Sequence, residues 1–262
     1  MRIEERLKES VARHGAYPVV IAGRASHSYA ELDLKSERLA AALEGGGVGH
    51  GDRVALFMDD GWEAVVSTFA VLKAGAVAVP VDASTSAVDL SAMLQKQQPV
   101  AVATQSRLAA LLATAVATAL SVRLVVLAGG DRARAGDTCI SFEEAVGRIG
   151  RVPSLAPAGS DADAAVVIGS EAPISHRQLL EDAAAVAPAG EGIVLPPLAE
   201  RAGLSRLLAA IDAGSSMMVR SRLVPEVTAD RRTAAPRDES RFAVARLLDA
   251  AAAVGATPAL QR

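Results

Sequence analysis

Val71-Leu-Lys-Ala-Gly-Ala-Val-Ala-Val-Pro-Val-Asp82 joins two elements of opposite kind. Upstream of it, Trp62, Val65 and Phe69 recur at helical spacing, which predicts a helix over residues 61–74. Residues 76–81 are a short, continuous apolar run, which predicts a buried strand. A helix that leads into a wholly apolar strand is typical of proteins with parallel β-sheets.

The same alternation continues on both sides of this stretch. Further helices are predicted over 2–14, between Ser28 and the helix-stopping Gly45-Gly46-Gly47, over 87–97 and 106–119, after Ser141, from His176, and over 200–213. Further strands are predicted over 19–22, 26–29, 54–58, 100–104, 122–128, 164–168, 192–195 and 216–219, with an exposed loop over 129–140. We therefore expect an α/β fold of layered, mostly parallel sheets flanked by helices.

The domain organisation follows from shifts in composition along the chain. Residues 1–223 are expected to form the α/β domain, with a possible subdomain break in the Pro-, Gly- and Ser-rich segment 150–160. Residues 224–238 are polar and predict a linker. Residues 239–262 predict a C-terminal helix and tail, and this helix is apolar on more than one face. Such a helix must bury itself on its own domain or on a partner.

Composition and charge exclude several classes of function. The hydrophobic share is 51% with only 3% aromatic residues, so the core must consist of Ala, Val and Leu. A net charge of −3 without a basic stripe argues against a nucleic-acid partner. Cys139 is the single cysteine, which excludes an intramolecular disulfide. No apolar run is long enough to cross a membrane, and the N-terminus lacks an apolar signal-peptide core. The expected location is the cytoplasm.

Several motifs in fixed order carry a resemblance to a known family. They are Ser28-Tyr-Ala-Glu-Leu-Asp33, Gly49-His-Gly-Asp-Arg-Val-Ala-Leu56, residues 71–82, Ile174-Ser-His-Arg-Gln-Leu-Leu180, residues 195–204 and residues 213–219. Together they resemble the N-terminal part of the adenylate-forming superfamily, which includes acyl-CoA synthetases, luciferases and the adenylation domains of nonribosomal peptide synthetases. The resemblance covers roughly residues 10–225. It implies the fold of the first half of that family's large N-terminal domain.

One internal segment departs from the family's pattern. The family has a phosphate-binding loop that resembles "TSGTTGxPKG", whereas only Gly169-Ser-Glu-Ala-Pro173 stands here between Ile168 and Ile174. Gly169 and Ser170 are its vestigial positions, and no Thr or Lys remains. Such a loop holds phosphate through its backbone amides and its Lys. The resemblance therefore implies the fold, while the short segment predicts no nucleotide cofactor and argues against ATP-dependent adenylation. The acidic magnesium residue, the ribose-binding Asp and the mobile C-terminal domain of the family also have no counterpart in the sequence.

Four residues flank the place where that cleft would lie. Glu171, His176, Glu200 and Arg201 are the candidates for a new site, and Glu171 and Glu200 could form an acid/base pair. The simpler interpretation of His176 is a surface histidine in the first turn of a helix. The simpler interpretation of Glu171 and Glu200 is that they are solvated carboxylates. Ser175 has a capping explanation, because Gln178 stands three residues later. No metal site is expected, since no second His, Cys or acidic pair accompanies His176.

Other conspicuous residues have structural explanations. The glycines at 45–51 follow a helix and precede a strand, which indicates a helix stop and not a phosphate loop. Lys73, Pro80 and Asp82 are expected to pack a helix against a strand. Met217-Met218 is expected in the core of a strand, and Cys139 is interpreted as an incidental thiol that could be exposed.

Three functions remain open. The first is a non-catalytic, adenylation-like protein (a pseudoenzyme) that acts as a scaffold or docking partner in natural-product or acyl and amino-acid metabolism. It would self-associate or bind another protein. The second is a repurposed enzyme that binds an unidentified small molecule in the vacated nucleotide cleft. The third is one half of a split adenylating ligase, which the missing Thr and Lys disfavour.

Overall fold

The computed structural model describes residues 1–129, 138–148, 159–186 and 192–219. Its strands form two sheets. The four-stranded sheet has the order β10 (Ile193–Val194), β11 (Met217–Met218), β1 (Pro18–Ala22), β2 (Ala25–Ser28). The seven-stranded sheet has the order β7 (Cys139–Ser141), β6 (Leu124–Ala128), β5 (Ala101–Gln105), β3 (Arg53–Phe57), β4 (Val77–Val81), β8 (Ala164–Val166), β9 (Ile174–Ser175). The expected α/β architecture is confirmed.

Helices connect most of these strands. They are α1 (Ile3–His14), α2 (Tyr29–Gly45), α3 (Trp62–Lys73), α4 (Ala87–Gln97), α5 (Ala109–Val116), α6 (Phe142–Gly147), α7 (His176–Ala185) and α8 (Arg201–Ala213), with a 3₁₀ turn (Ser106–Leu108) before α5. Among the described residues no helix is long and apolar enough to cross a membrane. The side chains of Ser28, Ser86, Ser141 and Ser175 accept the cap hydrogen bonds of α2, α4, α6 and α7.

Most strand pairs are parallel. The exceptions are β1 with β2 and β8 with β9, which are antiparallel. Strands β3, β4 and β5 occupy the centre of the larger sheet, with Val54 opposite Ala78 and Ala101. Apart from Arg53, Thr104 and Gln105, their side chains are apolar on both faces, as is typical of buried parallel strands.

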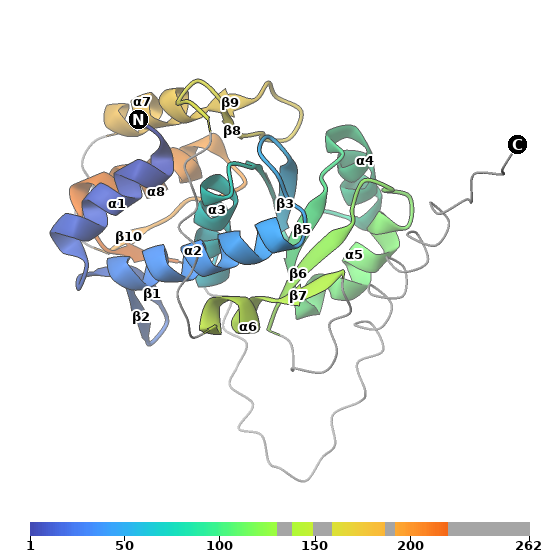
Figure 1. Cartoon of the computed structure of the whole chain (residues 1–262), viewed down its shortest axis with the longest axis horizontal. Helices are drawn as coiled ribbons and strands as arrows, with labels where there is room; N and C mark the ends of the chain where they lie inside the picture. The colour runs from blue at the N-terminus through green and yellow to red at the C-terminus, as the bar shows by residue number, and fades with distance from the viewer. Residues whose placement is uncertain (130–137, 149–158, 187–191, 220–262) are drawn as a thin grey trace, which may run out of the picture.

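Alternate residues of the central strand β3 face two different cores. Val54 and Leu56 of β3 belong to the larger core, which also holds residues of α2, α3 and the smaller sheet. Ala55 and Phe57 face the second core, formed with α4 and α5. Helices α2 and α3 thus cover one face of the larger sheet and α4 and α5 the other (Figure 1). Successive side chains of a strand point to opposite faces of the sheet, and this alternation produces the layering.

Residues 71–82 connect α3 to β4 through a glycine turn. The Ala76 N–H donates to Val71 O and the Gly75 N–H to Leu72 O, each at 3.0 Å. Gly75 has a φ of 69°, a left-handed conformation that glycine adopts without strain. This pair of hydrogen bonds ends α3 and directs the chain into the central strand.

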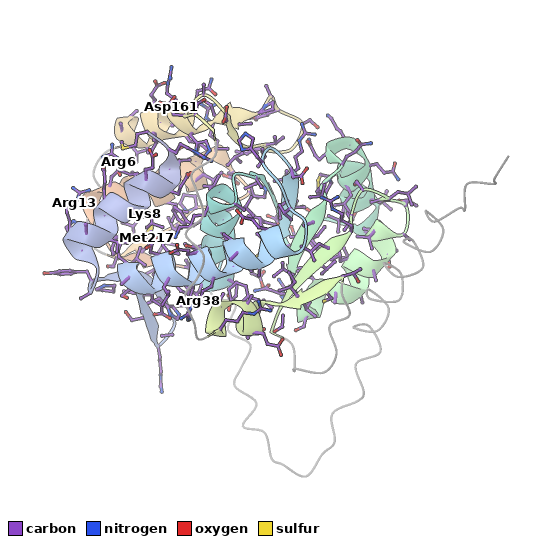
Figure 2. The ribbon with its side chains drawn as sticks, viewed as in Figure 1. Arg6, Lys8, Arg13, Arg38, Asp161 and Met217 are labelled. Atoms are coloured by element: carbon purple, nitrogen blue, oxygen red, sulfur yellow. The ribbon has the colours of Figure 1, made fainter. Side chains whose placement is uncertain are left out.

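Buried polar contacts join the helices of this layer. Lys73 Nζ lies 2.5 Å from Asp33 Oδ1 and donates to Asp33 O at 2.7 Å, so it links α3 to α2. Burial lowers the pKa of Lys73, and the Asp33 carboxylate opposes that effect. Arg38 of α2 donates to Val146 O at the end of α6 (2.9 Å; Figure 2). These contacts fix α2 between its neighbours.

Some expectations need correction. The predicted loop over 129–140 includes the start of β7, where Cys139 is half-buried because it pairs with Val125. Met217 is buried as expected, but Met218 is 45% exposed because it faces outward on a short strand. The predicted helix over 106–119 is reduced to a 3₁₀ turn and α5. The predicted linker 224–238, the C-terminal helix and most of the segment 150–160 lie outside the described residues.

Candidate functional site

A groove opens at the carboxyl ends of β3 and β4. This is the position at which open parallel sheets usually bind ligands. Residues that follow the two strands form one side, and the segment after β10 forms the other. The cavity measures about 490 Å³ and is lined by Met58, Asp59, Asp60, Val81, Asp82, Ala83, Ser84, Val194, Leu195, Pro196, Pro197 and Ala199.

The charged side chains of this lining are all acidic. Asp59 pairs with Arg107 (Oδ2 to Nε 2.9 Å), and Asp60 Oδ1 accepts from the Leu198 N–H at 2.8 Å. Asp82 Oδ1 accepts from the Ser84 N–H at 2.6 Å. Burial raises the pKa of Asp60, and the neighbouring carboxylates of Asp82 and Asp59 raise it further. Because Asp59 is paired with Arg107, the remaining negative charge of the groove comes from Asp60 and Asp82. Such a lining favours a cationic ligand over an anion.

The short segment 169–173 forms a closed turn. Glu171 donates its N–H to Ile168 O at 3.0 Å, and the buried Gln97 side chain donates to Gly169 O at 2.8 Å. Gly169 has a φ of 54°, which a tight turn requires and glycine allows. The flanking residues pair as the antiparallel strands β8 and β9, and β9 lies in a segment that the sequence assigned to no strand. Ser170 is exposed.

This geometry differs from a phosphate cradle. A cradle presents several free backbone N–H groups to the anion and adds a cation. Here one N–H of the turn is used within it, Pro173 has none, and the side chain of Glu171 adds an exposed carboxylate. The residues at the vestigial positions Gly169 and Ser170 therefore do not fit a nucleotide polyphosphate.

His176 is buried, so the expectation of a surface histidine is wrong. It is 1% exposed and faces the N-terminal segment of the chain. Its Nδ1 accepts from the Ile3 N–H (3.3 Å) and lies 3.6 Å from Glu4 Oε2, while its Nε2 lies 3.5 Å from Arg2 Nη2. Burial, reinforced by the Arg2 charge, lowers the pKa of His176 to about 4. A neutral imidazole thus anchors the start of α1 to α7.

The other three candidates lie at the surface. Glu171, Glu200 and Arg201 are exposed, and none of them lines the groove. Arg201 Nε pairs with Asp182 Oδ2 at 2.6 Å, which raises the pKa of the guanidinium, and Glu171 adds a smaller effect of the same sign. Glu171 and Arg201 are therefore within electrostatic reach of each other, and His176 belongs to a different cluster.

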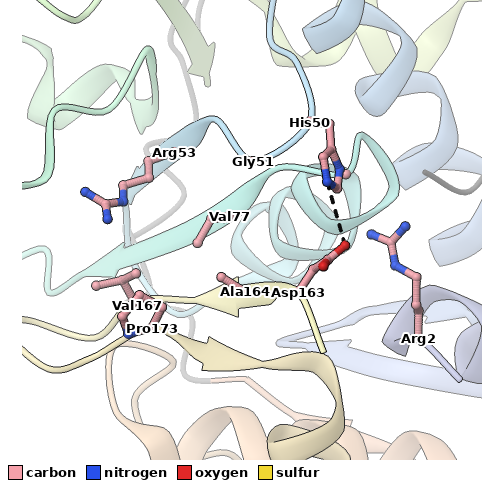
Figure 3. Close-up of a pocket in the computed structure, with 10 residues that line it drawn as sticks. Arg2, His50, Gly51, Arg53, Val77, Asp163, Ala164, Val167 and Pro173 are labelled. Carbon is pink, nitrogen blue, oxygen red and sulfur yellow. Dashed lines mark ion pairs between the residues drawn. The ribbon is translucent and has the colours of Figure 1, made fainter. Parts of the chain in front are cut away.

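A second cavity of about 260 Å³ lies beside the amino ends of β3 and β4. His50 and Asp163 pair across it, with Nε2 and Oδ2 3.7 Å apart (Figure 3). Arg53 donates to Gln97 O at 3.0 Å, and Asp163 also accepts from the Ser160 N–H at 2.8 Å. This cavity is the smaller of the two, and His50 and Asp163 in its lining pair with each other, so we interpret it as structural.

Sequence reasoning missed the acidic groove. Asp59 and Asp60 directly follow an apolar strand, and that position was the available signal. What the sequence could not reveal is that residues 194–199, which follow a strand of the other sheet, close the groove. Among the described residues, no group of three His, Cys, Asp or Glu side chains could hold a metal ion.

Comparisons with known proteins place this geometry in context. A model of the AMP-binding enzyme family matches residues 7–168. Isonitrile lipopeptide synthase of Mycobacterium tuberculosis is 40% identical over 111 residues, which is 42% of this chain and 4% of that protein. Salicyl-AMP ligase / salicyl-S-ArCP synthetase of the same organism is 49% identical over 57 residues, which is 22% of this chain and 10% of that protein.

Solved structures share the fold at low sequence identity. Coronafacic acid ligase from Pectobacterium brasiliense superimposes with a TM-score of 0.75 at 17% identity, and the match covers 84% of this chain and 45% of that ligase. The chain thus spans less than half of that ligase and a small fraction of the two Mycobacterium tuberculosis proteins.

Proposed function

Because the chain belongs to the AMP-binding enzyme family, we propose that it keeps the family's fold as a protein-binding scaffold and forms no adenylate itself. The observation that carries this proposal is the closed turn at residues 168–171. The short segment lies inside the chain, between β8 and β9, and these two strands still pair with each other.

Electrostatics support the same conclusion. A nucleotide polyphosphate beside this turn would meet the exposed Glu171 carboxylate with no Lys in residues 169–175 to balance it. Two like unit charges about 4 Å apart repel by roughly 1 kcal/mol in water and about 4 kcal/mol near a protein surface. The loss of the Lys removes an attraction of similar size. For an exposed carboxylate the lower figure applies, so affinity for ATP should fall by at least about 30-fold relative to an intact loop.

Two exposed apolar side chains, one on α4 and one in the turn after α5, are our candidate for protein contact. Val88 and Leu120 are 78% and 82% exposed. A hydrogen bond between the hydroxyls of Ser91 and Thr118, 2.8 Å apart, holds α4 to the turn after α5. The names of the relatives, a lipopeptide synthase and a salicyl-AMP ligase, support a partner in natural-product or acyl metabolism. This part of the proposal is an analogy.

Calorimetry with ATP and Mg²⁺ tests the central claim. We expect no binding heat at millimolar nucleotide, both for the natural chain and for Glu171→Gln, because the variant removes the charge without supplying amides or a Lys. Micromolar binding by the natural chain would overturn the proposal and support one half of a split ligase.

Light scattering and co-purification from the native host test the scaffold role. We expect a homodimer or a complex that the double variant Val88→Asp/Leu120→Asp loses. Ala25→Asp, which adds a charge to an exposed position on the other sheet, should leave it intact. A strict monomer at high concentration without any co-purifying protein would refute this role.

The groove beyond β3 and β4 favours one alternative, a repurposed enzyme or binding protein. Its volume of about 490 Å³ suits a small molecule. Its acidic lining favours a cationic ligand over a nucleotide. The residues to test are then Asp60 and Asp82, in place of the surface candidates. Thermal stabilisation by a panel of small amines, lost in Asp60→Asn, would support this alternative.

A further inference from the structure

Helix α4 exposes one continuous face along its length. The exposed residues of the helix are Val88, Asp89, Ala92, Gln95 and Lys96, which together we call the α4 face. At 3.6 residues per turn, these five positions fall within an arc of about 120°. Ala92 lies at the middle of this arc and also at the middle of the helix. The face is therefore centred on a small side chain, which allows another helix to approach closely.

The two charges of the α4 face have opposite signs. Asp89 lies in the first turn of the helix and Lys96 in the last, and they share one side of the face because seven residues make nearly two full turns. In the part of the chain that the structure describes, neither forms an ion pair. Asp89 Oδ2 accepts from the Ser86 hydroxyl at 2.7 Å, but this neutral donor does not balance the negative charge. Both charges can therefore pair with another molecule.

The surface beside the α4 face is uncharged. Thr118, in the turn after α5, lies 2.8 Å from the Ser91 hydroxyl and accepts from Gln95 Nε2 at 2.9 Å. Residues 108–122 contain no charged side chain, although 22% of the residues of the whole chain are charged. This stretch includes Leu120, which is 82% exposed. Charged residues are depleted at the centre of protein interfaces, so this surface is typical of an interface.

A second copy of the α4 face is its own geometric complement. If two α4 helices pack antiparallel about a two-fold axis beside Ala92, Asp89 of each copy faces Lys96 of the other. Val88 of each copy then faces Gln95 of the other. A two-fold axis makes each of these contacts twice. A parallel arrangement would instead place like charges together, which is unfavourable. The charges therefore select one partner and one orientation.

We propose that the α4 face binds a second copy of this chain, antiparallel about a two-fold axis at Ala92, with reciprocal ion pairs between Asp89 and Lys96. This inference rests on the scaffold proposal, because it names the partner of the surface at Val88 and Leu120. Helix α4 is about 16 Å long, and two adjacent helices are about 20 Å wide, so the contact covers a few hundred Å² per copy. Standard interfaces cover about 800 Å² per partner. The dimer is therefore weak and reversible.

Sedimentation equilibrium over a concentration series tests the ion pairs by charge reversal. We expect the natural chain to self-associate at micromolar to millimolar concentrations. Asp89→Lys and Lys96→Asp should each raise the dissociation constant about tenfold, because every ion pair becomes a like-charge pair. Asp89→Lys/Lys96→Asp should restore it to within about threefold, since the pairs form again with their signs exchanged. Glu181→Lys, at an exposed position of α7, is the control and should change nothing.

Cysteine cross-linking tests the position of the two-fold axis. In a Cys139→Ser background, Ala92→Cys should form an intermolecular disulfide in a glutathione redox buffer, because residues at the axis lie next to their own copies. Val88→Cys is the matched control. It is more exposed, but the two copies of this position lie about 12 Å apart along the helix axis, beyond the 4.4–6.8 Å between Cα atoms that a disulfide spans.

Several results would overturn the second copy as the partner. They are a monomer at every concentration, a dimer that ignores both charge reversals, and a double reversal that stays as weak as the single ones. A host protein that binds the natural chain, but not Val88→Asp/Leu120→Asp, would keep the scaffold role and replace the second copy as the partner. Micromolar ATP binding would refute the scaffold proposal instead, whatever the state of association. Unchanged thermal unfolding of each variant shows that its fold is intact.

Discussion

The buried His176 makes the stability of this protein depend on acid. Its pKa of about 4 lies below the usual value of 6.5 because burial and Arg2 disfavour the charged ring. A histidine whose pKa is depressed by folding stabilises the protein fully above pH 6.5. This contribution is lost as the pH falls from 6.5 to about 4, since the unfolded chain then binds the proton more strongly.

The shift of about 2.5 units corresponds to roughly 3 kcal/mol at 1.36 kcal/mol per unit. That is a large part of the 5–15 kcal/mol by which domains are usually stable. Glu4 acts in the opposite direction. Burial raises its pKa, so its protonation in acid favours the folded state. The net profile of the natural protein is therefore shallower than the contribution of His176 alone.

His176→Gln isolates the histidine, because Glu4 is present in both proteins. Urea unfolding at pH 7 and at pH 4.5 should show that the natural chain loses about 2–3 kcal/mol more than the variant does. Far-UV circular dichroism of both proteins at each pH confirms the starting fold. If the natural chain and the variant lost the same unfolding free energy between pH 7 and pH 4.5, a buried, neutral His176 would be refuted.

The remaining predictions concern stability and are measured by urea unfolding. Lys73→Met should lower the free energy of unfolding by about 3–5 kcal/mol, because it leaves the partly buried Asp33 carboxylate without its cation. The double variant Lys73→Met/Asp33→Leu should recover much of this stability. Equal losses in the single and the double variant would disprove the pairing. Gly203→Ala should destabilise by about 1–3 kcal/mol, since its Cβ would meet a backbone oxygen at 2.1 Å, whereas Gly45→Ala has open space and should be neutral or stabilising. Ser175→Ala should lose about 1 kcal/mol with its helix cap, and no change would mean that the cap contributes nothing.

Local signals in the sequence predicted the elements well. The Ser175 cap with Gln178 at the third helical position appears as a complete capping box. The helix over 87–97 has the predicted bounds, because an N-cap serine and a left-handed Gln98 mark its ends. Such signals need only neighbouring residues, so they can be read from one segment at a time.

Long-range contacts explain what the sequence could not predict. His176 looked like a surface residue because its helix is amphipathic and polar at that turn. Its burial depends on Arg2 and Glu4, which are over 170 positions away. The groove likewise needs Asp60 and Leu198, joined across 138 positions by a hydrogen bond. No pattern within a single segment carries that information.

The shortened turn also explains how the fold can persist without a phosphate loop. Strands β8 and β9 pair directly, with Val166 opposite Ile174, and Gln97 anchors the turn from another helix. Halving the length of a loop lowers its closure entropy cost by only about 0.6 kcal/mol, so stability hardly depends on the loop in either direction. Phosphate binding, in contrast, depends on it almost entirely. A chain that keeps its cores and caps while closing this turn is the basis of our proposal that the fold serves something other than holding a nucleotide.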